Sequence, residues 1–398
     1  MTGDLPKTDQ VSQEERDRAE EYRRERQKRE AIKAGVDAID PSKHIEWLLN
    51  NEELMVRAAI AGGATTDELP DFIREYRESL NDVSLGSEYD DPHALHIMNR
   101  VIKEIESICT KFRIPLRNGV VFGVTPGFGL VANQSPVMTT DASMIGLSLP
   151  FFNFCNAVAK ATAKSLVYSK HGNNWIVDNR PSSIQAKLQA EPDILRLWIE
   201  LLEVFGASRH PPDLSTPTFT PIEGTIRTQL LRSIELFSIA HEYGHHVLKH
   251  GVVESTNESE DKFGQEHDAD VFGQTISMLA SMSDAAGNIY AEAGVGAVLI
   301  LGTLDLVRRA EALLATGSDV PEPRKSHPPF LDRIRFIAPL DKIAPENRRT
   351  ELVDRRRSFC EIMEVIWSEV RPHLLAQHVA GVRPTDRRSD QGGWLPLA

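Results

Sequence analysis

One short segment limits the fold of this chain more than any other. Residues 241–245 form an HExxH motif inside the segment ELFSIAHEYGHHVLKHG, in which apolar residues recur at helical spacing. Four helical residues advance the chain by about 400°, so His241 and His245 lie on one face. The segment therefore predicts a helix that presents two imidazoles and the Glu242 carboxylate together, and we expect this helix to stop at Gly251.

This arrangement predicts a metal site. Two imidazoles on one helical turn can both reach one ion at about 2.0–2.1 Å, and Glu242 beside them can take a proton from water. A catalytic zinc usually has three protein ligands and one position for water. We therefore expect one Zn²⁺ per chain, bound by His241, His245 and a third ligand from elsewhere, with Glu242 as general base.

The tract KFGQEHDADVFGQTISMLA offers the strongest candidates for the third ligand. Glu266 and Asp270 are four residues apart and share a helix face. Glu266 can bind the metal, and Asp270 can accept a hydrogen bond from the non-ligating nitrogen of one histidine. Other acidic or imidazole side chains stay open as ligands at this stage: His250, Glu254, Glu258, Asp261 and His267.

Two motifs resemble those of a known family. HEYGH followed by E-x-x-A-D is similar to the gluzincin pattern of the HtpX and CAAX-prenyl protease group, and residues 326–337, SHPPFLDRIRFI, resemble its His-Pro…Arg-Ile segment. The resemblance implies a zincin-type metallopeptidase domain. It implies that Glu266 is the third zinc ligand and that Asp270 contacts a ligand residue without binding the metal itself. It also implies that His327 faces the active site and that Arg333 braces the helix or contacts the ligand.

The chain departs from that group in one respect. Its members often have transmembrane helices beside the site, whereas the longest apolar run here, Ala293–Leu304, is shorter than the ~20 residues that a membrane span needs. We expect a buried helix there. The N-terminus has no signal-peptide pattern, and the three cysteines are scattered, which favours a reducing compartment. The sequence thus predicts a cytoplasmic protein without a membrane partner.

The fold class expected is α+β and mostly helical, with a small sheet packed on the HExxH helix. Residues 1–40 predict a charged helical or disordered extension that is exposed to solvent, and residues 41–115 a helical subdomain. Residues 116–340 would form the zincin-like domain, and residues 341–398 a C-terminal helix with a loose tail.

Within these regions, three short segments rich in β-branched residues predict strands: NGVVFGVTP, FGLVANQ and ASMIGLSLP. By the resemblance, the third of them is the edge strand that aligns a peptide substrate. Helix starts are expected at Asp40 and Asp91, each followed by proline, and at Thr65 with Glu68 as a capping box.

The function expected is that of a zinc-dependent endopeptidase. Glu242 would act as general base, and His327 is the candidate donor to the oxyanion. The partner is then a peptide or protein; the net charge of −13 argues against nucleic acid. Three alternatives remain: an inactive or regulated binding module with the same fold, a hydrolase of another amide or ester, and a host-directed defence or toxin protease.

Overall fold

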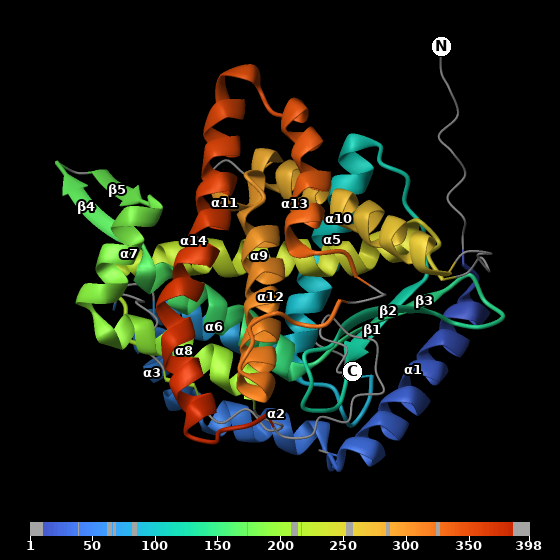
Figure 1. The fold of residues 1–398 in the computed structure, drawn as a ribbon. Coiled ribbons are helices and arrows are strands. Elements are labelled where there is room, and N and C mark those ends of the chain that lie inside the picture. The colour runs from blue at the N-terminus through green and yellow to red at the C-terminus, as the bar shows by residue number, and fades with distance from the viewer. Residues whose placement is uncertain are drawn as a thin grey trace.

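The computed structural model is mostly helical, as the sequence predicts, and it contains two small sheets (Figure 1). It describes residues 11–38, 40–61, 66, 69–81, 86–172, 174–207, 214–215, 217–251, 258–283, 287–323 and 327–384. Among these residues, no helix combines the length and the apolar character that a membrane span requires.

The N-terminal region consists of helices, as expected. They are α1 (Gln13–Ala34), α2 (Pro41–Asn50), α3 (Glu52–Ala61), α4 (Leu69–Asn81) and α5 (Pro92–Phe112). The helix starts predicted at Asp40 and Asp91 are confirmed, because each carboxylate accepts hydrogen bonds from backbone N–H groups of the first turn of α2 or α5. The capping box predicted at Thr65 lies outside the described residues.

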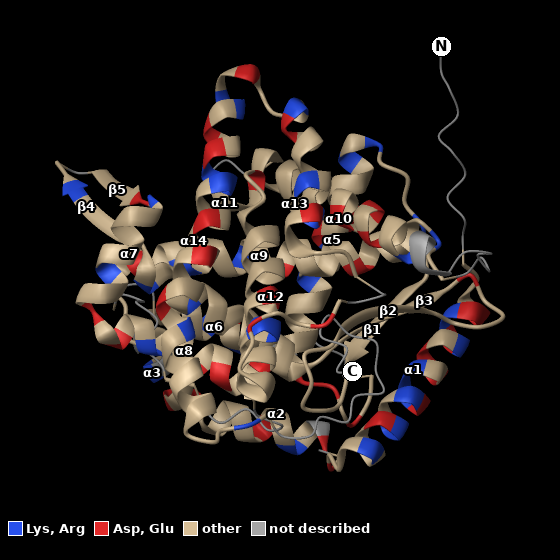
Figure 2. Cartoon of the chain, in the orientation of Figure 1, with Lys and Arg blue, Asp and Glu red and all other residues tan. Residues whose placement is uncertain are grey.

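The helix α1 is not the solvated extension that its composition suggests. Acidic and basic residues alternate along it (Figure 2), yet it contacts the strands β1 (Val120–Val124) and β3 (Ser143–Leu147). Arg23 is buried and its Nη1 lies 3.0 Å from Oδ2 of Asp90, while Gln27 Nε2 donates to the carbonyl of Val124 at 2.6 Å. Buried polar partners and the apolar contacts of Ala19 and Tyr22 together hold this helix against the sheet.

The three predicted strands form one sheet in the order β1-β3-β2, with β2 at Ala132–Pro136. β1 is parallel to β3, and β2 is antiparallel to it. All five residues of β3 are buried, as expected for the central strand of a covered sheet. The expectation that ASMIGLSLP is the edge strand is therefore wrong: that segment is β3, and β2 is the edge strand nearest the HExxH helix.

A helical layer follows the sheet in the chain. It contains α6 (Leu149–Ser165), α7 (Pro181–Ala190) and α8 (Pro192–Ala207). Between α6 and α7, an antiparallel hairpin of β4 (Val167–His171) and β5 (Asn174–Asp178) was not expected, although Gly172 separates two segments that contain β-branched and aromatic residues.

The remaining elements surround the helix that carries the HExxH motif. They are α9 (Pro221–Val247), α10 (Glu258–Ser283), α11 (Ile289–Glu292), α12 (Val295–Thr316), α13 (Phe330–Ile337), the 3₁₀ helix η1 (Ala338–Ile343) and α14 (Glu346–Val379). α9 crosses the middle of the molecule and packs against α5, α6, α10, α12 and β2 (Figure 1). The apolar run in α12 is buried, as predicted.

The start of α9 is fixed by local chemistry. The Thr220 hydroxyl accepts from the Glu223 N–H, and the Glu223 carboxylate accepts from the Thr220 N–H, which forms a capping box with Pro221 at the first helical position. Lys164 of α6 lies 2.9 Å from Glu223 Oε1 and ties the two helices together. These contacts set the register from which the motif follows about five turns later.

Candidate metal centre

The last turns of α9 bring the two motif histidines together. Nε2 of His241 and Nε2 of His245 are 3.1 Å apart. His241 is fully buried, and the side chain of His245 is 12% exposed. Glu242 is only 3% exposed and lies on the same turn. The helix thus presents two imidazole nitrogens toward one point, as its spacing predicts.

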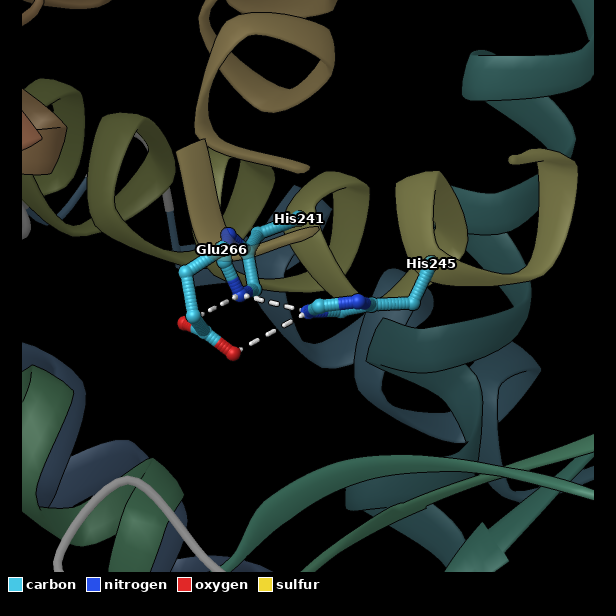
Figure 3. Close-up of side chains that lie close together, drawn as sticks. All are labelled: His241, His245 and Glu266. Atoms are coloured by element: carbon cyan, nitrogen blue, oxygen red, sulfur yellow. Dashed lines mark hydrogen bonds and ion pairs between the residues drawn. The ribbon is translucent and has the colours of Figure 1, made fainter. Parts of the chain in front are cut away.

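Glu266 completes the cluster from α10. Its Oε2 is 3.6 Å from Nε2 of His241, and its Oε1 is 3.6 Å from Nε2 of His245 (Figure 3). The three side chains converge from two neighbouring helices, and one ligand atom of each lies within 4.8 Å of the others. Among the described residues, this is the group of histidine, cysteine and acidic side chains that could hold a metal ion.

These distances suit a single small cation. Ligand atoms on a tetrahedral zinc are about 3.3–3.4 Å apart, because each lies about 2.0–2.1 Å from the metal. The two histidine Nε2 atoms are 3.1 Å apart, and each lies 3.6 Å from one of the two oxygens of Glu266, close to that value. In addition, Oε2 of Glu266 is buried and accepts no hydrogen bond, although the guanidinium of Arg333 lies 3.3 Å from it, so a lone pair of this oxygen is available to a metal ion. The donor set, two imidazoles and one carboxylate, is also one that zinc uses in catalytic sites.

Asp270 lies behind His241, one helical turn beyond Glu266. Its Oδ1 is 3.0 Å from Nδ1 of His241, and its side chain is 0% exposed. Arg333 of α13 donates to both oxygens of this carboxylate, at 2.7 Å from Nε and 2.6 Å from Nη2. The same Nη2 is 3.3 Å from Oε2 of Glu266. Arg333 therefore braces both acidic residues of α10.

The charges of this cluster explain its pKa shifts. Burial favours a higher pKa for Asp270, but Arg333 and His241 hold the pKa of that carboxyl below its ordinary value. Burial favours a lower pKa for His241, but the hydrogen bond and charge of Asp270 outweigh it and the pKa is raised. Burial and the neighbouring positive charges hold the pKa of His245 well below its ordinary value. Burial raises the pKa of Glu266.

His327 lies at the border of the cluster, just before α13. Its Nε2 is 3.7 Å from Oε2 of Glu266, and its side chain is 20% exposed. The structure thus places His327 beside the candidate ligand Glu266, where the resemblance to the protease group expects it. Its role as donor to an oxyanion stays a prediction.

The rival histidines face other partners. The ring of His267 stacks on Phe336 at a centroid distance of 3.6 Å. Nε2 of His246 is 3.0 Å from the carbonyl of Arg117, which precedes β1, and burial lowers the pKa of His246 to about 4. His250 lies against His245 but on the Nδ1 side of its ring. Of the other rivals, Glu254 lies outside the described residues.

Two glycines let α9 and α10 approach closely enough for this geometry. A methyl group at Gly273 would lie 3.1 Å from the carbonyl oxygen of Phe237 and 3.2 Å from the backbone nitrogen of His241. A methyl group at Gly244 would lie 3.1 Å from the side chain of Phe272. The α10 residues that face His241 are thus set at a fixed depth by backbone contact, a feature that the sequence pattern did not reveal.

The end of α9 differs from the prediction. The helix ends at Val247, with Leu248 as its C-cap. This end lies four residues before Gly251, the residue at which the sequence predicts the helix to stop. Lys249 takes the left-handed conformation with φ +58°, and Gly251 follows with φ +75°. The chain therefore turns sharply just after the second motif histidine.

A cavity of about 740 Å³ lies elsewhere in the molecule. It is bounded by α6, α8, the end of β1 and the segment after α1, and none of the three candidate ligands lines it. Its volume is typical of small-molecule sites. We nevertheless place the candidate site at the cluster of His241, His245 and Glu266, because these side chains can together bind one metal ion.

Comparison of the chain with protein-family models, with curated proteins and with solved structures finds no match.

Proposed function

We propose that this protein is a zinc-dependent peptidase whose metal is held by His241, His245 and Glu266. The observation that carries the proposal is the convergence of these three side chains: the two histidine Nε2 atoms are 3.1 Å apart, a Glu266 oxygen lies 3.6 Å from each, and the buried carboxylate of Glu242 is on the same helical turn. A site built only to bind a metal has no need of that fourth group. A hydrolytic site needs it as a base.

Zinc bound in such a site supplies Lewis acidity, which activates water and polarises a carbonyl group. Glu242 takes a proton from the attacking water and later delivers it to the leaving amine. Asp270, held by Arg333, keeps the Nδ1 proton on His241 and leaves its Nε2 free to act as a ligand. His327, whose Nε2 is 3.7 Å from Oε2 of Glu266, is the residue that we propose as donor of a hydrogen bond to the developing oxyanion.

The edge strand β2 supports a peptide as the substrate. Ser148 N–H donates to the Val131 carbonyl, and Val137 N–H donates to the Ala142 carbonyl, so odd-numbered residues of this segment bond to β3. The backbone groups of Ala132 and Gln134 then point to the other side, where no strand of the described residues pairs with β2. An extended peptide can add there as a further strand.

This edge ends beside the proposed metal centre. β2 contacts α9, and a side chain at Gly251 would touch the ring of Pro136, the last residue of β2. A peptide that pairs with β2 would therefore run toward the end of α9, where His245 lies. The proposal of a peptidase over a hydrolase of small amides or esters rests on this proximity.

The test is the Glu242→Gln variant, which keeps the size of the side chain and removes the base. We expect it to bind one zinc per chain and to lose hydrolysis of a fluorescence-quenched peptide library by at least about 10²-fold, the usual contribution of a general base. Glu346→Gln, an exposed residue of α14, is the matched control and should behave as wild type. If Glu242→Gln cleaves at the wild-type rate, Glu242 is not the base and the mechanism is wrong.

The alternative of an inactive binding module is separated by the same assay. A module of that kind would bind zinc and peptides in both forms and would cleave none of the library in either. A hydrolase of other amides or esters would leave the peptides intact but hydrolyse small chromogenic esters in a Glu242-dependent way.

A further inference from the structure

We propose that His250 is a positioning residue for His245: its ring accepts a hydrogen bond from Nδ1 of His245 and so presents Nε2 of that residue to the metal. This inference rests on the proposed metal centre and adds a residue to it. The two Nδ1 atoms are 2.8 Å apart, and the rings meet edge to face with centroids 4.9 Å apart. That distance is within the range of a nitrogen–nitrogen hydrogen bond.

The backbone after α9 is folded in a way that places His250 there. The N–H of Lys249 donates to the carbonyl of His246 at 3.1 Å, and the N–H of His250 donates to the carbonyl of His245 at 3.0 Å. With Lys249 at φ +58°, these two bonds form a Schellman turn. His250 is thus bonded to His245 twice, once through the backbone and once through the ring.

A left-handed Lys249 indicates that the turn is held firmly. This conformation costs a residue with a β-carbon about 1–2 kcal/mol, and glycine is the usual choice at this position. Here the glycine comes two residues later, at Gly251. The Schellman turn therefore begins immediately after the motif, so that the second residue beyond the cap, His250, falls over the ring of His245.

The positions of the protons follow from the geometry. Nε2 of His245 faces His241 and Glu266, so a metal held there requires Nε2 to be unprotonated. The proton of the neutral ring is then on Nδ1, which must donate to His250. His250 consequently offers an unprotonated Nδ1 and carries its own proton on Nε2.

His250 is not among the described side chains that converge as candidate metal ligands. Its Nδ1 contacts Nδ1 of His245, whereas it is the other ring nitrogen of His245, Nε2, that faces Glu266. The two histidine ligands are thus oriented by different partners: a buried carboxylate, Asp270, for His241, and a neutral imidazole for His245. An imidazole orients its partner without adding negative charge to a site that already contains Glu242, Glu266 and Asp270.

The test compares three variants of the full chain. His250→Phe keeps a planar ring but removes the acceptor, and His250→Asn restores an acceptor oxygen. His267→Phe is the control, since His267 stacks on Phe336 outside the cluster. The first readout is the Zn²⁺ dissociation constant, measured by competition with a chelator. The second is the imidazole N–H resonance of His245 in the zinc-loaded protein, where a hydrogen-bonded proton exchanges slowly with water.

We expect His250→Phe to weaken zinc binding by about 10–100-fold, the usual effect of losing a partner of a ligand histidine, and to abolish the protected resonance. His250→Asn should recover most of both, and the control should match wild type. If His250→Phe keeps the wild-type zinc affinity and the protected resonance, or if His250→Asn fails to rescue either, His250 does not position His245.

The two proposals fail separately. Wild-type protein that binds zinc through His245 and responds to the His250 variants as expected, yet cleaves no peptide, would contradict the peptidase and leave the role of His250 intact. Wild-type protein that cleaves peptides, with unchanged zinc affinity in His250→Phe, would contradict the role of His250 alone.

Discussion

The carboxylate of Asp270 lies 3.0 Å from Nδ1 of His241, the ring nitrogen that faces away from Glu266. Glu266 and Asp270 are one helical turn apart on α10, so a single helix provides both a candidate ligand and the group that orients another ligand. The pair works only if α10 is held at the correct depth and rotation against α9. Arg333 and Gly273 are two of the residues that hold it there.

The buried ion pair of Arg333 with Asp270 predicts a large loss of stability when it is broken. Arg333→Met leaves a buried carboxylate with only His241 as a partner, and removal of one member of such a pair costs about 3–5 kcal/mol. We expect urea unfolding to show this loss and zinc binding to weaken at the same time. Arg333→Lys keeps the charge without the two parallel hydrogen bonds, so its stability and its zinc affinity should lie between those of Arg333→Met and wild type. Equal stability of Arg333→Met and wild type would rule out a bracing role.

The close approach at Gly273 predicts that a single methyl group will disturb the site. In Gly273→Ala the new carbon would press on the backbone of Phe237 and His241, which cannot move aside as a side chain can. We expect a loss of about 1–3 kcal/mol in the unfolding free energy and weaker zinc binding, because Glu266 and Asp270 shift with α10.

The control for this prediction is on the same helix. Gly264 has no atom within 4 Å of the position of a β-carbon and is exposed. Gly264→Ala should therefore stabilise the protein by about 0.5–1 kcal/mol through helix propensity and leave zinc affinity unchanged. The contact at Gly273 would be unimportant if the two alanine variants behaved alike.

Glu235 on α9 predicts a pH dependence of stability that is separate from the metal centre. Burial raises its pKa from an ordinary value of 4.5 to about 7, although Arg232, Arg100 and Arg227 act against it. The folded protein then binds more protons than the unfolded chain between pH 4.5 and 7. The unfolding free energy should fall as pH rises through this interval, by about 3 kcal/mol at most.

Glu235→Gln removes that titration. Its unfolding free energy should exceed that of wild type at pH 8, and the difference should vanish below pH 4.5, where the wild-type carboxyl is protonated in both states. Chemical denaturation of both proteins across this range provides the measurement. A constant difference at all pH values would show that the pKa of Glu235 does not change on folding.

The sequence predicts the parts of the site that depend on one helix. The spacing of His241 and His245 sets their common face, and the four-residue spacing of Glu266 and Asp270 sets theirs. The helix starts at Asp40 and Asp91 are likewise local, because each cap needs only the residue and the turn that follows it. These features require no knowledge of the rest of the fold.

The remainder depends on contacts between distant segments. Arg23 is buried because it pairs with Asp90, which is 67 residues away in the sequence. The charged composition of α1 therefore wrongly predicts that this helix is exposed to solvent. The order β1-β3-β2 follows from a parallel pairing that short apolar segments do not reveal, and it makes β2 the edge strand. The contact of His250 with His245 depends on a left-handed Lys249, a conformation that lysine rarely adopts.

The most direct test of the central claim is the metal content per chain of purified wild type, His245→Ala, Glu266→Ala and His267→Ala, measured by mass spectrometry after incubation with zinc and removal of excess ion. We predict about one zinc per chain in wild type and in His267→Ala, and none in His245→Ala or Glu266→Ala. If Glu266→Ala retains zinc while His267→Ala loses it, the third ligand is His267. If wild type binds no metal at all, the account of this site as a zinc centre is wrong.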